Sequence, residues 1–241
     1  MDTIILGDGP LGQAVASAIE GRGDRARVIG RPPNGRRHDA ATFGGTDLIV
    51  DASRGESVRA NVEAAIEGGI RRFVIATTGW DGDRALVSGA LRDAGAAAVV
   101  APNLSLGAAL FLRLIDRATE LFGRVDAFDP YVLEWHRRAK RDRPSGTARE
   151  IVRRMAGGYA TEPDVAVIRA GASPGMHLVA FDATGETIEL RLTARDRSAY
   201  AAGALAAADW LMRRPRPAGV HPFDLVVDEL LTLQPALAAT A

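Results

Sequence analysis

The sequence predicts an α/β protein with a Rossmann-like, doubly wound parallel sheet and a second α+β domain with an open, mainly antiparallel sheet. Up to about residue 104, short apolar runs alternate with segments of helical periodicity, which is typical of a parallel sheet covered on both faces. Beyond residue 105, three runs alternate apolar with polar residues, as antiparallel strands with one wet face do. These observations place one domain at 1–104 and another at 105–212, with the tail at 213–241 packing back on the first.

The first domain is expected to contain five buried strands joined by helices. The predicted strands are 3–6, 25–29, 48–51, 73–76 and 97–100. A helix is predicted at 56–68, where Val58, Val62 and Ile66 recur at helical spacing.

The second domain is expected to open with a long helix at about 105–122. The alternating runs that follow are 165–169, 177–181 and 187–193. In the last run Ile188, Leu190 and Leu192 share one face, which predicts a strand with one face in water. A further helix is predicted at 199–212, before the prolines at 215 and 217.

Composition excludes several classes of protein. Apolar residues make up 47% and charged residues 25% of the 241 residues, which excludes a mostly disordered chain. Thirty Lys and Arg balance thirty Asp and Glu, so no nucleic-acid partner is expected. The chain has no cysteine, which excludes thiol catalysis and iron–sulfur clusters, and its four histidines are scattered, so no metal site is expected.

No membrane association is expected either. No apolar run approaches the roughly 20 residues that a membrane span needs. The chain starts Met1-Asp2-Thr3, without the basic stretch that opens a signal peptide. The expected location is therefore the cytoplasm.

A glycine-rich turn, Gly7-Asp8-Gly9-Pro10-Leu11-Gly12, joins the first strand to its helix. In the pattern G-x-G-x-x-G the first glycine permits the tight turn, the second lets the backbone approach a pyrophosphate, and the third lets helix and strand pack closely. The turn therefore predicts a dinucleotide site. The alternative is a glycine-rich turn that binds nothing.

The end of the second strand bears on the choice of cofactor. NAD-binding proteins usually carry an acid there for the ribose hydroxyls, but this chain reads Gly30-Arg31, with Arg36 and Arg37 beyond. An arginine at this place suits the 2′-phosphate of NADPH. NADPH is therefore the expected cofactor, with NADH as the alternative, unless Arg31 is simply a solvated loop residue.

A basic segment at 134–148 predicts an anion site. It begins Glu134-Trp135-His136, continues through Lys140, and ends in a run of small residues that opens a helix, with Thr147 and Glu150 at capping-box spacing. Cations that face a helix N-terminus bind a carboxylate well, and His136 and Lys140 could flank it. The alternative is a solvated, basic loop.

This segment resembles the signature of the dihydrodipicolinate reductase family, E-x-H-H-x-x-K-x-D-x-P-S-G-T-A. Four more segments resemble family motifs: 76–80 (G-T-T-G-F), 101–105 (A-P-N-F-S), 169–177 (R-x-G-x-x-x-G-x-H) and 193–203 (closing S-R-x-x-F-A-x-G). The resemblance covers nearly the whole chain. It implies a homotetrameric enzyme of the diaminopimelate route of lysine biosynthesis, which reduces 4-hydroxy-tetrahydrodipicolinate, a cyclic imine dicarboxylate, to tetrahydrodipicolinate with a nicotinamide hydride.

The resemblance also implies roles for individual residues. His136 and Lys140 would be the catalytic pair, with Lys140 the proton donor. The substrate would be bound by Arg137, Ser145, Gly146 and Thr147. The dinucleotide would contact Gly7, Asp8, Gly9, Pro10, Leu11, Gly12, Arg31, Ala76, Thr77, Thr78, Ala101, Pro102, Asn103 and Leu104.

Four departures from the family pattern are present. Arg137 replaces the family's second histidine, which contacts the substrate. The glycine turn is one residue shorter, Gly30 replaces an acid, and Leu104 replaces an aromatic residue. Two alternatives therefore stay open: a related imine reductase with another carboxylate substrate, favoured by Arg137, and a catalytically silent NADP-binding sensor.

Overall fold

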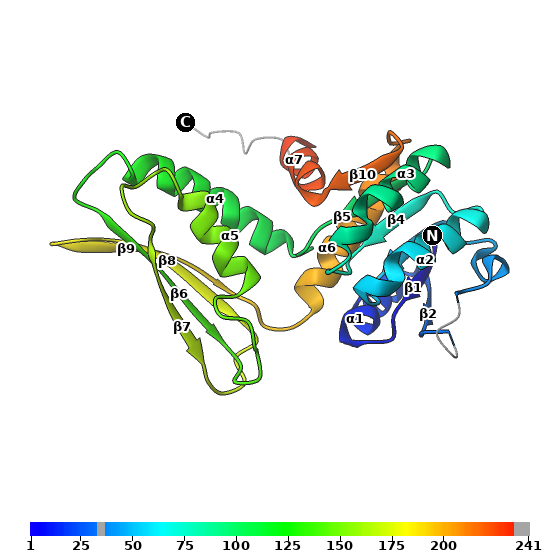
Figure 1. Cartoon of the computed structure of the whole chain (residues 1–241), viewed down its shortest axis with the longest axis horizontal. Helices are drawn as coiled ribbons and strands as arrows, with labels where there is room; N and C mark the ends of the chain where they lie inside the picture. Colours follow the sequence, from blue (N-terminus) through cyan, green and yellow to red (C-terminus); the bar gives the residue numbers. More distant parts are fainter. Residues whose placement is uncertain (33–36, 234–241) are drawn as a thin grey trace. The chain divides into compact units, whose positions relative to one another are not determined.

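The computed structural model describes residues 1–32 and 37–233. It forms two compact units (Figure 1). The first comprises Met1–Leu106 together with the chain from Arg197 onward, and the second comprises Gly107–Asp196.

The first unit contains a six-stranded sheet in the order β10-β5-β4-β3-β1-β2, in which every neighbouring pair is parallel. Its strands are β1 (Asp2–Leu6), β2 (Arg25–Ile29), β3 (Leu48–Asp51), β4 (Arg72–Ile75), β5 (Ala97–Val100) and β10 (Gly219–Pro222). The five predicted strands are confirmed. The edge strand β10 was not predicted, because four residues that include His221 and Pro222 show no strand pattern.

Helices cover both faces of this sheet. They are α1 (Pro10–Glu20), α2 (Gly55–Glu67), α3 (Arg84–Asp93), α6 (Ser198–Arg213) and α7 (Phe223–Leu233). Helix α1 packs against α6, and α2 packs against α3. Val58, Val62 and Leu91 from α2 and α3 are fully shielded against Ile4 and Phe73 of the sheet, which forms the larger core.

Helix α6 corrects the predicted domain boundary. We expected the helix at 199–212 in the second domain, because it follows the alternating strands directly in sequence. In the structure it belongs to the first unit. A Cβ on Gly203 would lie only 1.5 Å from the carbonyl oxygen of Leu104, so glycine lets α6 touch the loop after β5. Arg22, just after α1, also pairs with Asp209 of α6 at 2.9 Å.

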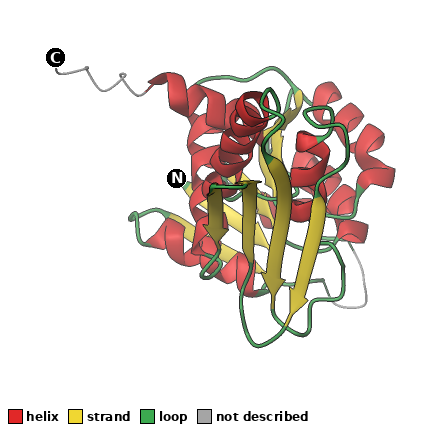
Figure 2. Cartoon of the chain, turned by 90° about the vertical axis from the view of Figure 1, so that its left-hand side faces the viewer, coloured by secondary structure: helices red, strands yellow, loops and turns green. Residues whose placement is uncertain are grey.

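The second unit is a four-stranded mixed sheet in the order β7-β6-β8-β9 (Figure 2). Its elements are α4 (Leu106–Phe122), β6 (Asp129–His136), α5 (Gly146–Met155), β7 (Asp164–Arg169), β8 (Met176–Ala183) and β9 (Glu186–Thr193). Strand β6 is parallel to β7 and antiparallel to β8, and β8 is antiparallel to β9. The expected, mainly antiparallel sheet is confirmed.

The central strand β6 was missed in the sequence. The face it turns toward the helices carries Val132, Glu134 and His136, all buried. Two ionisable residues on a buried face conceal the period-two alternation of apolar residues that identified β9. The missed strand is therefore the one that carries the predicted catalytic histidine.

The core of the second unit lies between α4, α5 and this sheet. Phe111 and Ile115 of α4 and Ile151 and Met155 of α5 pack with Phe181 of β8. Among the described residues, no helix is both long enough and apolar enough to span a membrane.

Candidate active site and cofactor-binding loops

The glycine turn after β1 has the geometry of a phosphate cradle. Gly7 has a φ of +116°, and a Cβ there would lie 2.4 Å from the carbonyl oxygen of Ala52. A Cβ on Gly12 would lie 1.9 Å from the carbonyl oxygen of Gly7, so α1 packs directly on the turn. A Cβ on Gly9, the N-cap residue of α1, would point into open space. The room at Gly9 and the first N–H groups of α1 therefore suit the pyrophosphate of a dinucleotide.

A buried carboxylate ties together the loops after β3 and β4. Asp51, the last residue of β3, is 1% exposed. Its Oδ1 accepts hydrogen bonds from Ser53 N (3.0 Å), Ser53 Oγ (2.7 Å) and Thr77 Oγ1 (2.6 Å). Its Oδ2 accepts one from Asn61 Nδ2 (2.8 Å). The predicted cofactor residue Thr77 is thus held by Asp51, which was not among the predicted site residues, although an acid that ends an apolar strand is a signal in the sequence.

The other predicted cofactor residues also follow the carboxyl ends of strands, where ligands bind in open parallel sheets. Thr77 O accepts a hydrogen bond from Trp80 Nε1 (2.9 Å), which fixes the loop at 76–78. In the loop at 101–104, Asn103 Oδ1 accepts from Ser105 N (2.9 Å), and Leu104 is 2% exposed. Arg31 lies after β2 and is largely exposed, with Nη1 3.9 Å from Glu56 Oε1.

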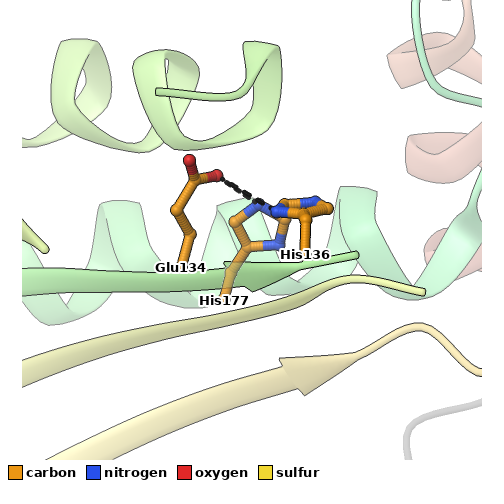
Figure 3. A group of neighbouring side chains, drawn as sticks. All are labelled: Glu134, His136 and His177. Atoms are coloured by element: carbon orange, nitrogen blue, oxygen red, sulfur yellow. Dashed lines mark ion pairs between the residues drawn. The ribbon is translucent and has the colours of Figure 1, made fainter. Parts of the chain in front are cut away.

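In the second unit, the adjacent strands β6 and β8 bring together Glu134, His136 and His177 (Figure 3). Glu134 is fully buried, and each histidine is 7% exposed. Glu134 Oε2 lies 3.5 Å from His136 Nδ1 and 3.7 Å from His177 Nε2. The two imidazole rings meet edge to face, with centroids 5.1 Å apart.

The other oxygen of Glu134 is firmly bound. Oε1 accepts hydrogen bonds from Arg169 Nη2 (2.6 Å) and from Ser145 N (3.0 Å). The same Arg169 nitrogen donates to the carbonyl oxygen of Asp142 (2.6 Å). Arg169 therefore joins the strand β6 to the loop that carries Lys140, and Ser145 joins β6 to the start of α5.

This environment shifts the pKa values of the cluster. Burial opposes ionisation of Glu134, but His177, Ser145 and Arg169 outweigh it and hold its pKa well below the usual range. Burial, reinforced by the charge of His177, lowers the pKa of His136 to about 4. At neutral pH the site therefore contains an ionised Glu134 beside a neutral His136.

Glycine makes room for the imidazole of His136. Gly175 precedes β8 with a φ of +150°, and a Cβ there would lie 3.1 Å from His136 Nε2. A side chain at this position would be strained and would crowd the ring.

Lys140 lies in the loop that follows β6. Its Nζ is 2.9 Å from Asp142 Oδ1, and the hydrogen bond from Lys140 lowers the pKa of Asp142. The Lys140 side chain is 28% exposed. Arg137, at the start of the loop, is exposed.

The N-terminus of α5 differs in detail from the prediction. The helix begins at Gly146, and the N-cap is Ser145, whose Oγ accepts from Ala148 N (3.1 Å). The expected capping box of Thr147 and Glu150 is wrong, because Glu150 pairs with arginines in its own helix. Ser145 Oγ also lies 3.1 Å from His177 Nε2. Ser145 N donates to Glu134, and Ser145 Oγ satisfies the N–H group of Ala148. In the first turn of α5, the N–H groups of Gly146 and Thr147 therefore remain without intrahelical partners.

The cluster also has the composition of a metal site, although no metal was predicted. Glu134, His136 and His177 each offer a ligand atom, and these atoms lie within 4.8 Å of one another. The histidines are far apart in sequence, and only the pairing of β6 with β8 brings them together. Arg169, a cation, already binds the carboxylate, and the absence of a metal stays a prediction.

Comparison with known proteins identifies the family. The family model described as "Dihydrodipicolinate reductase, C-terminus" matches residues 107–225. A curated 4-hydroxy-tetrahydrodipicolinate reductase from Archaeoglobus fulgidus is 34% identical over 198 residues, which is 74% of each chain. Another, from Rhodopirellula baltica, is 32% identical over 233 residues, or 84% of this chain and 81% of the relative. The chain belongs to the dihydrodipicolinate reductase family.

Solved structures agree on the fold. A dipicolinate-bound dihydrodipicolinate reductase from Paenisporosarcina sp. TG-14 has a TM-score of 0.72 at 17% identity, covering 92% of this chain and 97% of that one. An engineered D-amino acid dehydrogenase bound to NADP⁺ has a TM-score of 0.52 at 15% identity, covering 98% and 99%. This member of the dihydrodipicolinate reductase family is therefore an oxidoreductase that uses a nicotinamide cofactor.

Proposed function

We propose that the protein is a cytoplasmic, NADPH-dependent reductase that converts 4-hydroxy-tetrahydrodipicolinate to tetrahydrodipicolinate in the diaminopimelate route of lysine biosynthesis. The observation that carries the proposal is the end of β6, where His136 and Lys140 occur beside the N-terminus of α5, which Ser145 connects to Glu134. The curated relatives bear the name of this activity.

The substrate loses its 4-hydroxyl group as water, which leaves a carbon–carbon double bond conjugated with the imine, and the cofactor, when bound, would supply a hydride to the carbon that carried the hydroxyl. Lys140, whose side chain is 28% exposed in the loop after β6, donates the proton to the atom that hydride arrival makes basic. His136, with a pKa of about 4, is neutral at physiological pH and acts as a hydrogen-bonding group rather than a cation. Glu134 Oε2 lies on the Nδ1 side of this ring, 3.5 Å away.

The substrate is a dicarboxylate in this proposal. The N–H groups of Gly146 and Thr147 bind one carboxylate at the helix N-terminus, where the helix dipole favours a negative charge. Arg137 binds the second one, since its guanidinium can donate two parallel hydrogen bonds. The dipicolinate named with the relative from Paenisporosarcina is such a dicarboxylate.

Oxidation of NADPH in the presence of enzymatically generated substrate tests the reaction itself. Turnover is expected, and pyridine-2,6-dicarboxylate should inhibit it competitively. Binding of NADPH without any turnover would instead support a cofactor sensor.

Arg137 separates the proposal from a related imine reductase. Arg137→His should retain inhibition by the dicarboxylate, while Arg137→Ala should weaken it by about 1.5–3 kcal/mol, the usual value of a hydrogen bond to a charged group. Turnover of a monocarboxylate imine, with no recognition of either dicarboxylate, would favour the related reductase.

The choice of cofactor is assigned to Arg31. Its guanidinium can bind the 2′-phosphate of NADPH if it leaves the exposed and weak pair with Glu56. Arg31→Ala should lower kcat/KM with NADPH and leave kcat/KM with NADH unchanged. Equal losses with both cofactors would contradict this role.

A homotetramer is part of the proposal. The sheet face opposite α4 and α5 exposes Trp135 (38%) and Ile168 (42%), neighbours on the paired strands β6 and β7. Adjacent exposed apolar residues on a sheet face suit an interface, and a second copy of this face would cover them. Light scattering should give the mass of a tetramer for the chain and a smaller mass for Ile168→Glu; an unchanged monomeric mass for both would contradict this assembly.

A further inference from the structure

The carboxylate of Asp8 lies where a side chain of residue 30 would lie. Strands β1 and β2 are parallel neighbours, and Gly7 N donates to Ile29 O (2.8 Å), so the glycine turn lies beside the end of β2. A Cβ on Gly30 would be 3.2 Å from Asp8 Oδ2 and 3.6 Å from Asp8 Cγ.

This place matters for cofactor recognition. In dinucleotide-binding sheets, an acid at the end of the second strand binds the hydroxyl groups of the adenosine ribose. Here the strand ends in Gly30, which has no side chain, and an acid reaches the same place from the preceding turn. The residues present therefore fit a ribose, and the sequence concealed this because the acid is 22 positions earlier in the chain.

We propose that Asp8 binds the adenosine ribose in place of a residue-30 acid and that it limits the preference for NADPH set by Arg31. The proposal rests on the assigned nicotinamide cofactor. Asp8 is exposed and Gly30 leaves space beside it, so its carboxylate can accept hydrogen bonds from two ribose hydroxyls. The same carboxylate repels a 2′-phosphate.

The charges nearby support a dual preference. Arg31 is matched by Glu56 at 3.9 Å, and Arg37, the next described arginine, pairs with Glu67 at 2.5 Å. Arg31 and Arg37 therefore both have an acidic partner before any cofactor binds. The 2′-phosphate of NADPH can bind Arg31 but is repelled by Asp8. The ribose hydroxyls of NADH can donate hydrogen bonds to Asp8. We expect dissociation constants for the two cofactors within about tenfold of each other, a difference of about 1.4 kcal/mol.

The test is calorimetric titration of the full chain with NADH and with NADPH, without substrate. Asp8→Ala should weaken NADH about tenfold or more, because a charged hydrogen bond is lost. It should tighten NADPH about three- to tenfold, and this gain should shrink at high salt, which screens the repulsion. Asp8→Asn, which keeps the shape, should tighten NADPH in the same way. Asp93→Asn, an exposed carboxylate at the end of α3, is the matched control and should change neither constant.

A rescue variant separates recognition from structural damage. Asp8→Ala combined with Gly30→Glu returns a carboxylate to the same place from the other strand, and it should recover NADH binding. Weaker binding of both cofactors by Asp8→Ala, or no change in either, would overturn the inference while the proposed function stands. Failure of the unmodified chain to bind either cofactor would overturn both.

Discussion

The two units each bury a carboxylate in the sheet that carries their candidate functional loops, but they surround it differently. Asp51 in the first unit accepts hydrogen bonds only from neutral donors, which belong to Ser53, Asn61 and Thr77, and both of its oxygens are satisfied. Glu134 in the second unit is bound by Arg169 at one oxygen and faces two histidines with the other, which has no hydrogen bond.

The difference shows how one kind of side chain serves two purposes. Neutral donors around Asp51 fix the loops after β3 and β4 without involving any proton that moves at neutral pH. Ionisable groups around Glu134 couple its charge to the protonation of His136 and to the loop of Lys140. The buried acid of the first unit is therefore a structural tie, whereas the buried acid of the second unit sets the electrostatics of the candidate active site.

The largest expected effect tests the proposed assignment of proton transfer to the second unit alone. Lys140→Ala should lower kcat by roughly 10²–10⁴, the usual contribution of a general acid. The Kd for NADPH, measured without substrate, should barely change. Arg141→Ala, an exposed cation in the same loop, is the control and should keep kcat. Nearly normal turnover of Lys140→Ala would support the alternative that Lys140 is only a residue of a solvated, basic loop.

Removing the cation beside Glu134 should strongly destabilise the fold. Arg169→Leu leaves a buried, ionised carboxylate without its partner, and such a loss costs about 3–5 kcal/mol. Arg153→Leu breaks an exposed pair with Glu150 and should cost only about 0–1 kcal/mol. Urea unfolding measures both. Adding Glu134→Gln to Arg169→Leu should recover stability, and a double variant that is less stable than the single one would contradict the charge argument.

As the pH falls, protonation of His136 should lower the stability of the second unit before protonation of the carboxylates does. The pKa of His136 is about 4 in the folded chain and about 6.5 when unfolded, so between these values the unfolded state binds more protons. The stability that neutral His136 contributes is fully present above about pH 6.5 and is lost as the pH falls toward 4. At pH 5 this loss amounts to about 2 kcal/mol of the free energy of unfolding. Glu134, whose pKa is also lowered, adds a further loss only below about pH 4.3.

Unfolding free energies between pH 7 and pH 4.5 measure this window. His136→Asn should flatten the curve there, because asparagine does not titrate. The same slope in His136→Asn and in the unmodified chain would assign the acid lability to other groups.

The smallest effect is expected at Asp51. Asp51→Asn keeps one acceptor oxygen for Ser53 and Thr77 and replaces the other with a donor that faces Asn61, at a cost of about 1 kcal/mol. The pH dependence of kcat should keep its shape, because no partner of Asp51 takes part in proton transfer. Glu134→Gln should change that shape. Identical pH profiles for the two variants would remove the distinction between the two carboxylates.

Local sequence patterns were sufficient to predict many of the strands. The five central strands of the first sheet and the strand β9 were predicted, because a period of two or a short apolar run is visible within a few residues. The motif at 134–148 indicated the family without any knowledge of tertiary contacts. Strand β6 escaped, because Glu134 and His136 interrupt its apolar face, and β10 escaped because it is short and lies at an edge.

The sequence by itself determined the class of fold and the family, and it predicted which residues carry the chemistry. Only the tertiary structure placed α6 with the first unit, through the close approach of Gly203 to Leu104. It alone put His177 and Arg169 around Glu134, and Asp8 beside Gly30. The physical reason is that strand pairing and glycine contacts join residues 20 to 100 positions apart, and their partners leave no periodic trace in either segment.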